Sequence, residues 1–428
     1  MHEFHYQDGE LYCEATPVLN AAERYGTPLY LYSHQTLVGH FRKLRDAFAP
    51  AKPLLCFSLK ANSSLALCRA LIREGAGMDI VSVGELRKAL LAGASPRKIV
   101  YASVGKTVAE IAEAVKVGIR CFNVESIPEL EQIDAACRRL HRRQLVALRI
   151  NPDVDPRTHP AIATGRGTDK FGVDPETARR VFAEAARYPG VILGGVHIHI
   201  GSQITESRPF VLAIKRALAL IDDVNRRGAS VRWLNIGGGL GIVYHRERPQ
   251  TAAEFARAVL PLLRVTHPNN GARRLRLILE PGRFIVGNSG ILVTRVLYLK
   301  QTPRRRFAIV DAGMNDLIRP SLYGAYHQIV PVAPRPGQTR PTERYDVVGP
   351  ICESGDVFAK GRPMAPLAPG DVLALLGAGA YGFSMASNYN ARPRPAEVLV
   401  MGSAMHLIRR RESLSDLVRG EMIPAVLR

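Results

Sequence analysis

The chain has 428 residues, of which 46% are hydrophobic and 22% are charged. This is an ordinary globular composition, and the length suits two domains rather than a single core. The formal net charge of +20 leaves anionic substrates or a generally arginine-rich composition open, but the basic residues are spread out without interleaved aromatic side chains, so we expect no nucleic-acid partner.

The amino-terminal residues and the cysteines both favour a cytoplasmic protein. Residues 1–10 (MHEFHYQDGE) are polar and contain no signal-peptide core. The longest uncharged stretch, residues 372–391, contains Ser, Asn, Tyr and Gly, so it predicts strand and loop rather than a membrane span. The six cysteines form no C-x-x-C pair and no zinc-ligand spacing. We therefore expect reduced thiols, no membrane partner and no bound metal.

From residue 54 to about residue 285, short apolar runs alternate with amphipathic helical patterns. The runs lie at 54–60, 79–83, 99–102, 120–124, 145–150, 193–200, 233–239 and 275–283. Between them, segments such as 64–74, 125–140 and 251–263 have apolar residues at intervals of three and four. Eight strand–helix units in this length predict a (β/α)8 TIM barrel, which we place at residues 31–285. The number of units disfavours a doubly wound open sheet.

After residue 285 the pattern changes to strands separated by Pro- and Gly-rich turns. The strand-like runs lie at 290–299, 306–312, 343–349, 371–377 and 396–402, and residues 331–337 and 361–370 are typical turns. Residues 286–428 therefore predict an all-β, barrel-like domain. Residues 1–30 carry short strand patterns and no barrel unit, so we group them with it. The predicted fold class is α/β plus β.

Reactive and polar residues gather at the predicted carboxyl ends of the barrel strands, where TIM-barrel chemistry takes place. They are Lys60, Asp79, His197, His199, Gly237, Gly238, Gly239, Glu280 and Arg283. A lysine at the end of a buried strand is poorly solvated, which favours the neutral amine that a Schiff-base nucleophile requires. Each residue alone has a simple structural explanation, but the whole set at one end of a barrel indicates a site.

Several of these patterns permit more than one interpretation. The glycines at 237–239 predict either a tight turn or a cradle for the phosphate of a small cofactor, because Ile242 replaces the last glycine of a dinucleotide motif. His197 and His199 alternate on one predicted strand and so face the same side. They are candidates for a hydrolase metal site with Asp79 and Glu280, or for stacking on an aromatic cofactor.

Three further motifs are ambiguous by themselves. Glu280 is a candidate for holding a cofactor ring nitrogen protonated, or for a salt bridge to Arg283. Cys352, in the segment 351–356 (ICESGD), is a candidate proton donor, but an isolated cysteine is more typical of a small buried residue. The segment 105–107 (GKT) imitates a phosphate-binding loop, but Val100 replaces the required first glycine, so we expect a helix amino terminus there.

Taken together, the motifs resemble those of the diaminopimelate decarboxylases, which are fold-type III pyridoxal-phosphate-dependent decarboxylases. The resemblance runs nearly end to end from residues 27–30 (TPLY). It rests on SLKAN at 58–62, DIVSVGEL at 79–86, HIGSQ at 199–203, GGGLG at 237–241, EPGR at 280–283, IRPSLYGAYH at 318–327, GPICESGD at 349–356 and AYGFSMASNYN at 380–390. We see no departure at a functional position.

The resemblance implies a role for each of these residues. Lys60 would bond covalently to pyridoxal 5'-phosphate, His199 would stack on its ring, and Glu280 would pair with its pyridine nitrogen. The cofactor-binding set would also contain Asp79, Ser202, Gly237, Gly238, Gly239, Pro281, Gly282, Arg283 and Tyr381. Arg283, Arg319, Tyr323, Glu353 and Tyr381 would bind meso-2,6-diaminopimelate, with L-lysine and CO2 as products. Cys352 would donate a proton, and its loop would come from the partner subunit of a homodimer with shared active sites.

Other activities are less consistent with the same residues. A relative acting on ornithine, arginine or a carboxylated polyamine would need only an anion at the far end of the substrate. Arg319 together with Glu353 matches a substrate with both a carboxylate and an ammonium there. A regulatory binding protein on the same fold would have no need for both Lys60 and Cys352.

Overall fold

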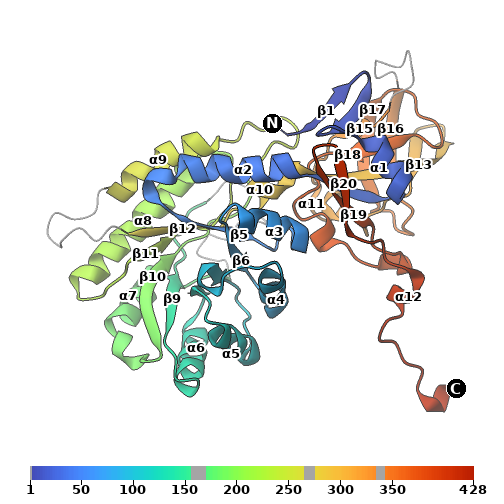
Figure 1. Cartoon of the computed structure of the whole chain (residues 1–428). Helices are drawn as coiled ribbons and strands as arrows, with labels where there is room; N and C mark the ends of the chain where they lie inside the picture. Colours follow the sequence, from blue (N-terminus) through green and yellow to red (C-terminus); the bar gives the residue numbers. More distant parts are fainter. Residues whose placement is uncertain (1, 156–169, 265–274, 334–342) are drawn as a thin grey trace. The chain divides into compact units, whose positions relative to one another are not determined.

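The computed structural model describes residues 2–155, 170–264, 275–333 and 343–428, which form two compact units (Figure 1). The first, here the barrel unit, comprises Val38–Val243 and Glu247–Ile285. The second, the β unit, comprises the chain up to Leu37, Tyr244–Arg246 and Val286–Arg428. Residues 31–37 and 244–246, which the sequence analysis assigns to the barrel, thus lie in the β unit.

The barrel unit contains eight parallel strands that close on themselves in chain order, which confirms the predicted TIM barrel. The strands are β5 (Leu54–Ser58), β6 (Gly77–Ile80), β7 (Ile99–Tyr101), β8 (Cys121–Val124), β9 (Gln144–Arg149), β10 (Val191–His197), β11 (Trp233–Asn235) and β12 (Arg276–Leu279). The predicted runs match them because strands covered on both faces are almost continuously apolar. Inside the barrel, small and branched side chains form a buried cluster: Cys56, Val100, Cys121, Ala147 and Ile278.

Amphipathic helices surround these strands (Figure 1). They are α2 (His34–Ala47), α3 (Leu65–Arg73), α4 (Val83–Leu91), α5 (Val108–Val117), α6 (Ile127–Arg139), α7 (Pro175–Ala183), α8 (Arg208–Arg226) and α9 (Ala252–Arg264), followed by the short α10 (Arg283–Val286). Ser82, Thr107 and Ser126 cap the helices that follow β6, β7 and β8 by accepting a backbone N–H three residues on. Thr107 and Glu110 form a capping box, so the GKT segment is the helix amino terminus that we expected.

The β unit is built on a nine-stranded sheet that runs β17-β16-β14-β13-β4-β19-β20, with β18 paired to β13 and β15 to β18. Its strands are β4 (Leu29–Ser33), β13 (Gly290–Gln301), β14 (Arg306–Val310), β15 (Ile329–Pro331), β16 (Glu343–Val348), β17 (Val357–Met364), β18 (Val372–Leu375), β19 (Ala396–Met401) and β20 (Ala404–Arg409). A separate small sheet contains β1 (Phe4–Gln7), β2 (Glu10–Cys13) and β3 (Thr16–Pro17). The predicted β domain is confirmed.

Strand β4 ties the amino-terminal segment into the β unit. All five of its residues are buried, and it lies antiparallel to β13 and parallel to β19. The core beside it includes Leu29, Leu31, Val293 and Val398. The described part of this unit also contains the α-helices α1 (Val18–Tyr25), α11 (Arg319–Tyr323) and α12 (Leu414–Leu417), so it is not purely β.

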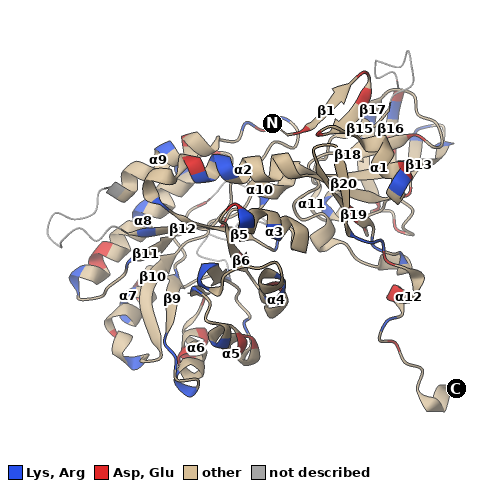
Figure 2. Cartoon of the chain, viewed as in Figure 1, with Lys and Arg blue, Asp and Glu red and all other residues tan. Residues whose placement is uncertain are grey.

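Charge and cysteine placement add two general features. Basic residues are interspersed with acidic ones over the helices of the barrel and the strands of the β unit (Figure 2). The chain's six cysteines, all in described segments, form no disulfide; five are buried and Cys352 is exposed. In the described segments, no helix is both long and apolar enough to cross a membrane.

Candidate active site

The amine of Lys60 and the carboxyl of Asp79 lie at neighbouring strand ends of the barrel. Lys60 follows β5 by two residues, and its Nζ lies 3.7 Å from Oδ2 of Asp79. The Ser58 hydroxyl, at the end of β5, donates a short hydrogen bond to the same oxygen. Asp79 is fully buried, and burial together with the charge of Glu280 raises its pKa to about 8. The Lys60 side chain is 36% exposed, so the amine remains accessible.

Glu280 directly follows β12 and is surrounded by groups that favour its ionised form. Its Oε1 accepts hydrogen bonds from Asn123 Nδ2 at 2.7 Å and from Asn235 Nδ2 at 2.6 Å. Its Oε2 lies 3.4 Å from His197 Nε2. Burial is the largest single influence and opposes ionisation, but His197, Lys60 and the amide donor outweigh it and lower the pKa of Glu280. The carboxylate is therefore an anion at neutral pH.

The glycine run after β11 forms a turn that no other residue type could make. Gly237 and Gly239 have φ of +67° and +108°. A Cβ on Gly238 would lie 2.1 Å from the Glu280 carbonyl oxygen, and one on Gly239 would lie 2.4 Å from the Gly201 carbonyl oxygen. The α-carbons of Gly238 and Gly239 are thus packed directly against neighbouring backbone, which leaves no room for a side chain.

His199 packs against this glycine loop. The Gly238 N–H donates to His199 Nδ1 at 3.2 Å, so this nitrogen carries a lone pair. Burial, followed by the positive charges of Lys60 and Arg149, holds the pKa of His199 well below its ordinary value, so the imidazole is neutral. Strand β10 ends at His197, and His199 lies beyond it. The two histidines contact different groups, His197 beside Glu280 and His199 beside the loop. Among the described residues, no three His, Cys, Asp or Glu side chains form a metal-binding group.

The segment 280–283 (EPGR) joins the glutamate to the lysine loop. The Ser58 N–H donates to the Pro281 carbonyl at 3.1 Å. A Cβ on Gly282 would lie 3.0 Å from the side chains of both Ser58 and Ala61, so the two loops are in close contact. The Arg283 guanidinium donates to Ser202 Oγ at 2.9 Å through Nη2, which brings two further predicted residues together.

The β unit holds the remaining predicted residues. Arg319 and Tyr323 are the first and last residues of α11, and Arg319 is buried. The Ser321 hydroxyl in the same helix donates to the Gly355 carbonyl at 2.6 Å, which links α11 to the ICESGD segment. Tyr381 is half-buried and has a φ of +58° in the loop after β18.

Cys352 and Glu353 lie on an exposed turn between β16 and β17. The buried carboxylate of Asp356 shapes this turn by accepting the N–H groups of Ile351 at 2.8 Å and Met314 at 2.7 Å. Because Cys352 is exposed, its interpretation as a small buried residue is wrong. An exposed thiol is free to act on another molecule or another subunit.

Comparisons with known proteins identify the family. Residues 34–287 match the model of the pyridoxal-dependent decarboxylases, pyridoxal binding domain. The chain is 48% identical to the diaminopimelate decarboxylase of Pseudomonas aeruginosa over 99% of both chains, and 47% identical to that of Vibrio cholerae over 97% and 98%. The chain belongs to the diaminopimelate decarboxylase family.

Solved structures agree with this assignment. The M. jannaschii diaminopimelate decarboxylase in complex with L-lysine matches with a TM-score of 0.93 and 36% identity, covering 100% of each chain. The Helicobacter pylori diaminopimelate decarboxylase in complex with L-lysine matches with a TM-score of 0.89 and 39% identity, covering 94% of this chain and 98% of that one.

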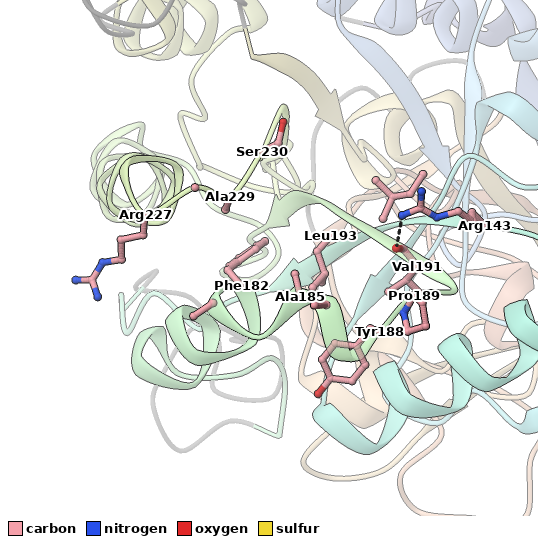
Figure 3. A pocket seen from close by; sticks show the side chains of 14 residues that line it. Arg143, Phe182, Ala185, Tyr188, Pro189, Val191, Leu193, Arg227, Ala229 and Ser230 are labelled. Carbon is pink, nitrogen blue, oxygen red and sulfur yellow. Dashed lines mark hydrogen bonds between the residues drawn. The ribbon is translucent and has the colours of Figure 1, made fainter.

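The predicted site residues lie at the carboxyl ends of the strands, whereas one open hollow lies at the opposite ends. The hollow has a volume of about 750 Å³. Its lining residues come from the end of α7, the start of β10 and the turn after α8, and they include Phe182, Leu193 and Arg227 (Figure 3). None of the predicted site residues lines it. The polar groups at the carboxyl ends of the strands thus indicate the predicted site, and this cavity does not.

Sequence reasoning missed the residues that hold the predicted site in shape. Asn123 and Asn235 are fully buried at the ends of β8 and β11 and donate to Glu280. Asn235 also accepts the Gly237 N–H at 2.9 Å, so one amide links the glycine loop to the glutamate. A polar residue interrupting an apolar strand (CFNV, WLN) was the available signal.

A buried ion pair beneath His199 was also missed. Arg149, at the end of β9, binds Glu125 at 2.7 Å and donates to the His199 carbonyl at 3.3 Å. Glu125 in turn accepts the Gly172 N–H at 3.0 Å. These contacts fix the backbone of His199, and no motif in the sequence indicates them.

Proposed function

We propose that this protein decarboxylates meso-2,6-diaminopimelate to L-lysine and CO2 with pyridoxal 5'-phosphate as cofactor, and that it does so in the cytoplasm. The observation that carries the proposal is the convergence of an accessible amine, an ionised carboxylate, a neutral imidazole and a glycine cradle at one end of the barrel. No hydrolytic or regulatory function requires all four groups together.

The groups present suit pyridoxal phosphate. Lys60 has the amine that would bond to it, and Glu280 is an anion that would hold the pyridine nitrogen protonated. The loop of Gly237, Gly238 and Gly239, with Ser202, would hold the phosphate, and His199 suits a ring face. Asp79, Pro281, Gly282, Arg283 and Tyr381 complete the cofactor-binding set. When bound, the cofactor supplies an acceptor for the electrons left behind as CO2 departs.

The chain's own residues account for the rest of the reaction. The Cys352 thiol would return a proton from Sγ to the carbon that lost CO2. Arg319 would bind the carboxylate at the far end of the substrate, and Glu353 would bind its ammonium. Arg283, Tyr323 and Tyr381 would complete the substrate contacts. This pair of opposite charges distinguishes diaminopimelate from ornithine or arginine.

A substrate panel and a covalent trap test the proposal. We expect the purified protein to release CO2 from meso-diaminopimelate far faster than from ornithine, arginine or lysine. Borohydride reduction should fix the cofactor on the peptide that contains Lys60. Lys60→Ala should abolish turnover, whereas Lys98→Ala, at the opposite end of the barrel, should not. Label on Lys106 or Lys170, or equal turnover of the panel, would contradict it.

We further propose a homodimer in which Cys352 and Glu353 complete the partner's site. Their exposure on a turn of the β unit supports this arrangement. Lys60→Ala and Cys352→Ala proteins should each be nearly inactive. A mixed dimer would collect both lesions in one site and leave the other intact, so random reassortment should restore about a quarter of wild-type activity. Differentially tagged mixed dimers without activity would show that each site comes from one chain.

A further inference from the structure

His327 holds the guanidinium of Arg319. It lies four residues after α11, is fully buried, and has a protein contact on each ring nitrogen. Its Nδ1 lies 2.8 Å from the Leu376 carbonyl oxygen, and its Nε2 lies 2.9 Å from Arg319 Nη1. Both contacts have hydrogen-bond geometry, so the imidazole bridges the end of β18 and the arginine.

These two contacts determine which nitrogen carries the proton. A carbonyl oxygen only accepts hydrogen bonds, so Nδ1 must be protonated. A guanidinium only donates, so Nε2 must present its lone pair. His327 is therefore neutral, and its Nε2 is an acceptor aimed at Arg319. A protonated Nε2 would instead point an N–H at a cation.

A second contact restrains the face of the guanidinium. The central carbon of Arg319 lies 4.7 Å from the ring centroid of Tyr244, and that ring packs edge-on against His327 at 5.5 Å and 77°. Tyr244 thus limits tilting of the guanidinium, while His327 limits its rotation. Both contacts lie within the β unit.

The backbone around His327 is held as well. The Leu376 N–H donates to the Gln328 carbonyl at 2.8 Å, next in the chain to His327. Arg362 Nη1 donates to the His327 carbonyl at 3.0 Å. The acceptor at Nε2 is consequently attached to the sheet through both its ring and its main chain.

We propose that His327 is a positioning residue that orients Arg319 to recognise the distal carboxylate of the substrate. The proposal rests on the function proposed for Arg319. An arginine fork binds a carboxylate well only in the plane and rotation that present two N–H groups together. His327 and Tyr244 restrict these two degrees of freedom, so the chain selects amino acids with a carboxylate at that end.

Two inhibitors that differ by one carboxylate test this idea. Loss of CO2 from one centre of diaminopimelate leaves L-lysine, whose remaining carboxylate belongs to the far end. Cadaverine is L-lysine without that group. The ratio of the two inhibition constants therefore measures recognition of the distal carboxylate. L-Lysine should inhibit the wild-type protein more strongly.

Paired substitutions separate the two ring nitrogens. Asn places a donor near the position of Nδ1 but cannot reach Arg319, whereas Gln places an acceptor near Nε2. We expect His327→Asn to lower the ratio of the inhibition constants, cadaverine over L-lysine, about tenfold. It should also raise KM for diaminopimelate more than it lowers kcat. His327→Gln should keep the ratio within about threefold of wild type, because charge-assisted contacts need an acceptor. Arg319→Met sets the value expected without recognition.

The outcomes distinguish the failure of each proposal. An unchanged ratio in Arg319→Met would show that Arg319 does not bind the distal carboxylate, and the proposed role of Arg319 would be wrong. If the ratio of inhibition constants falls in Arg319→Met but stays at the wild-type value in folded His327→Asn, the proposed role of His327 alone would be wrong. Equal weakening of both inhibitors would show a merely structural effect. If His327→Asn does not fold, a ratio in His327→Gln as low as in Arg319→Met would also overturn it.

Discussion

Asp79 and Glu280 are both buried carboxyl groups at strand ends of one barrel, yet their surroundings shift their pKa values in opposite directions. Asp79 has one hydroxyl donor, from Ser58, and a lysine amine at 3.7 Å. Its Oδ1 is buried with no hydrogen-bond partner in the described structure. Glu280 has two amide donors within 2.7 Å and His197 beside its other oxygen.

The difference shows that burial alone does not decide the charge of a group. Burial opposes ionisation of both carboxyls, and the number of donors and cations aimed at each one determines which remains an anion. Of these two carboxyls, only Glu280 is thus kept as an anion, at the position where a protonated ring nitrogen is expected. Substitutions of the two carboxyls and of their neighbours should therefore differ in their effects.

Among substitutions of these two carboxyls and their neighbours, Glu280→Gln should cause the largest loss of turnover. Glutamine keeps the shape of the side chain but cannot hold a ring nitrogen protonated, so kcat should fall roughly 10²–10³-fold, as for loss of other preorganised electrostatic groups. Cofactor affinity, measured by absorbance titration, should change much less. Near-normal turnover would show that the carboxylate has only a structural role.

Asn123→Leu should reduce the stabilisation of the ionised Glu280 side chain without removing its carboxyl group. The substitution deletes the donor at 2.7 Å and leaves similar volume in a fully buried position. A hydrogen bond to a charged group contributes about 1.5–3 kcal/mol, so turnover should fall roughly tenfold or more. The pKa of Glu280 should rise toward its ordinary value.

Acid unfolding of the cofactor-free protein gives an independent measurement of the expected change in the pKa of Glu280. A group whose pKa is lowered by folding stabilises the protein above its unfolded pKa, and this stability is lost as the pH falls through the folded pKa. Asn123→Leu should therefore unfold at a higher pH than wild type, as followed by circular dichroism. In the Asn123→Leu/Glu280→Gln double variant, the extra acid sensitivity should disappear. If it persists, Glu280 is not its source.

Asp79→Asn should have a smaller effect, with the opposite pH dependence. Folding raises the pKa of Asp79 from 3.8 to about 8. The stability that the Asp79 proton contributes is fully present below the unfolded pKa and is lost as the pH rises through the folded pKa. The free energy of unfolding should fall by at most about 1.4 kcal/mol per pH unit in this range. The Tm difference between Asp79→Asn and wild type should therefore move in favour of the variant between pH 4 and 8. Parallel Tm curves would contradict the assignment.

Arg227→Gln, in the hollow of Figure 3, should have the smallest effect. The Arg227 side chain is 66% exposed and pairs with Asp223 at 3.0 Å. Exposed ion pairs of this kind contribute about 0–1 kcal/mol, and no predicted site residue is nearby in the lining. Turnover should remain at the wild-type value. A loss comparable to that of Asn123→Leu would show that the opposite end of the barrel takes part in function.

Sequence reasoning located the barrel well because its strands are continuous apolar runs of similar spacing. It placed the barrel boundary at residue 31, inside β4, because a fully buried apolar strand (LYLYS) gives no local sign of the sheet to which it pairs. Tyr244–Arg246 likewise joins the β unit through tertiary contacts, such as Tyr244 beneath Arg319, that no local pattern records.

The candidate site was predictable as a set of residue types and not as a set of contacts. Lys60, Glu280 and the glycines stand out because lysines, carboxylates and glycines at strand ends have specific chemical uses. Asparagine has many structural uses, so the interruption of an apolar strand by Asn123 or Asn235 does not indicate which group its amide contacts. The contact of His327 with Arg319 requires the chain to turn back after α11 at Gly324, whose φ is +60°. That reversal becomes visible only in three dimensions.

The cysteines have a practical consequence for chemical labelling. Burial raises the pKa of the Cys13, Cys56, Cys68, Cys121 and Cys137 thiols, which keeps them protonated and unreactive, whereas Cys352 is exposed. One equivalent of a maleimide should thus attach a fluorophore to Cys352 in the native protein without prior mutagenesis. Because this residue lies on the turn that we propose completes the partner's site, the emission of such a probe should change with subunit association and ligand occupancy.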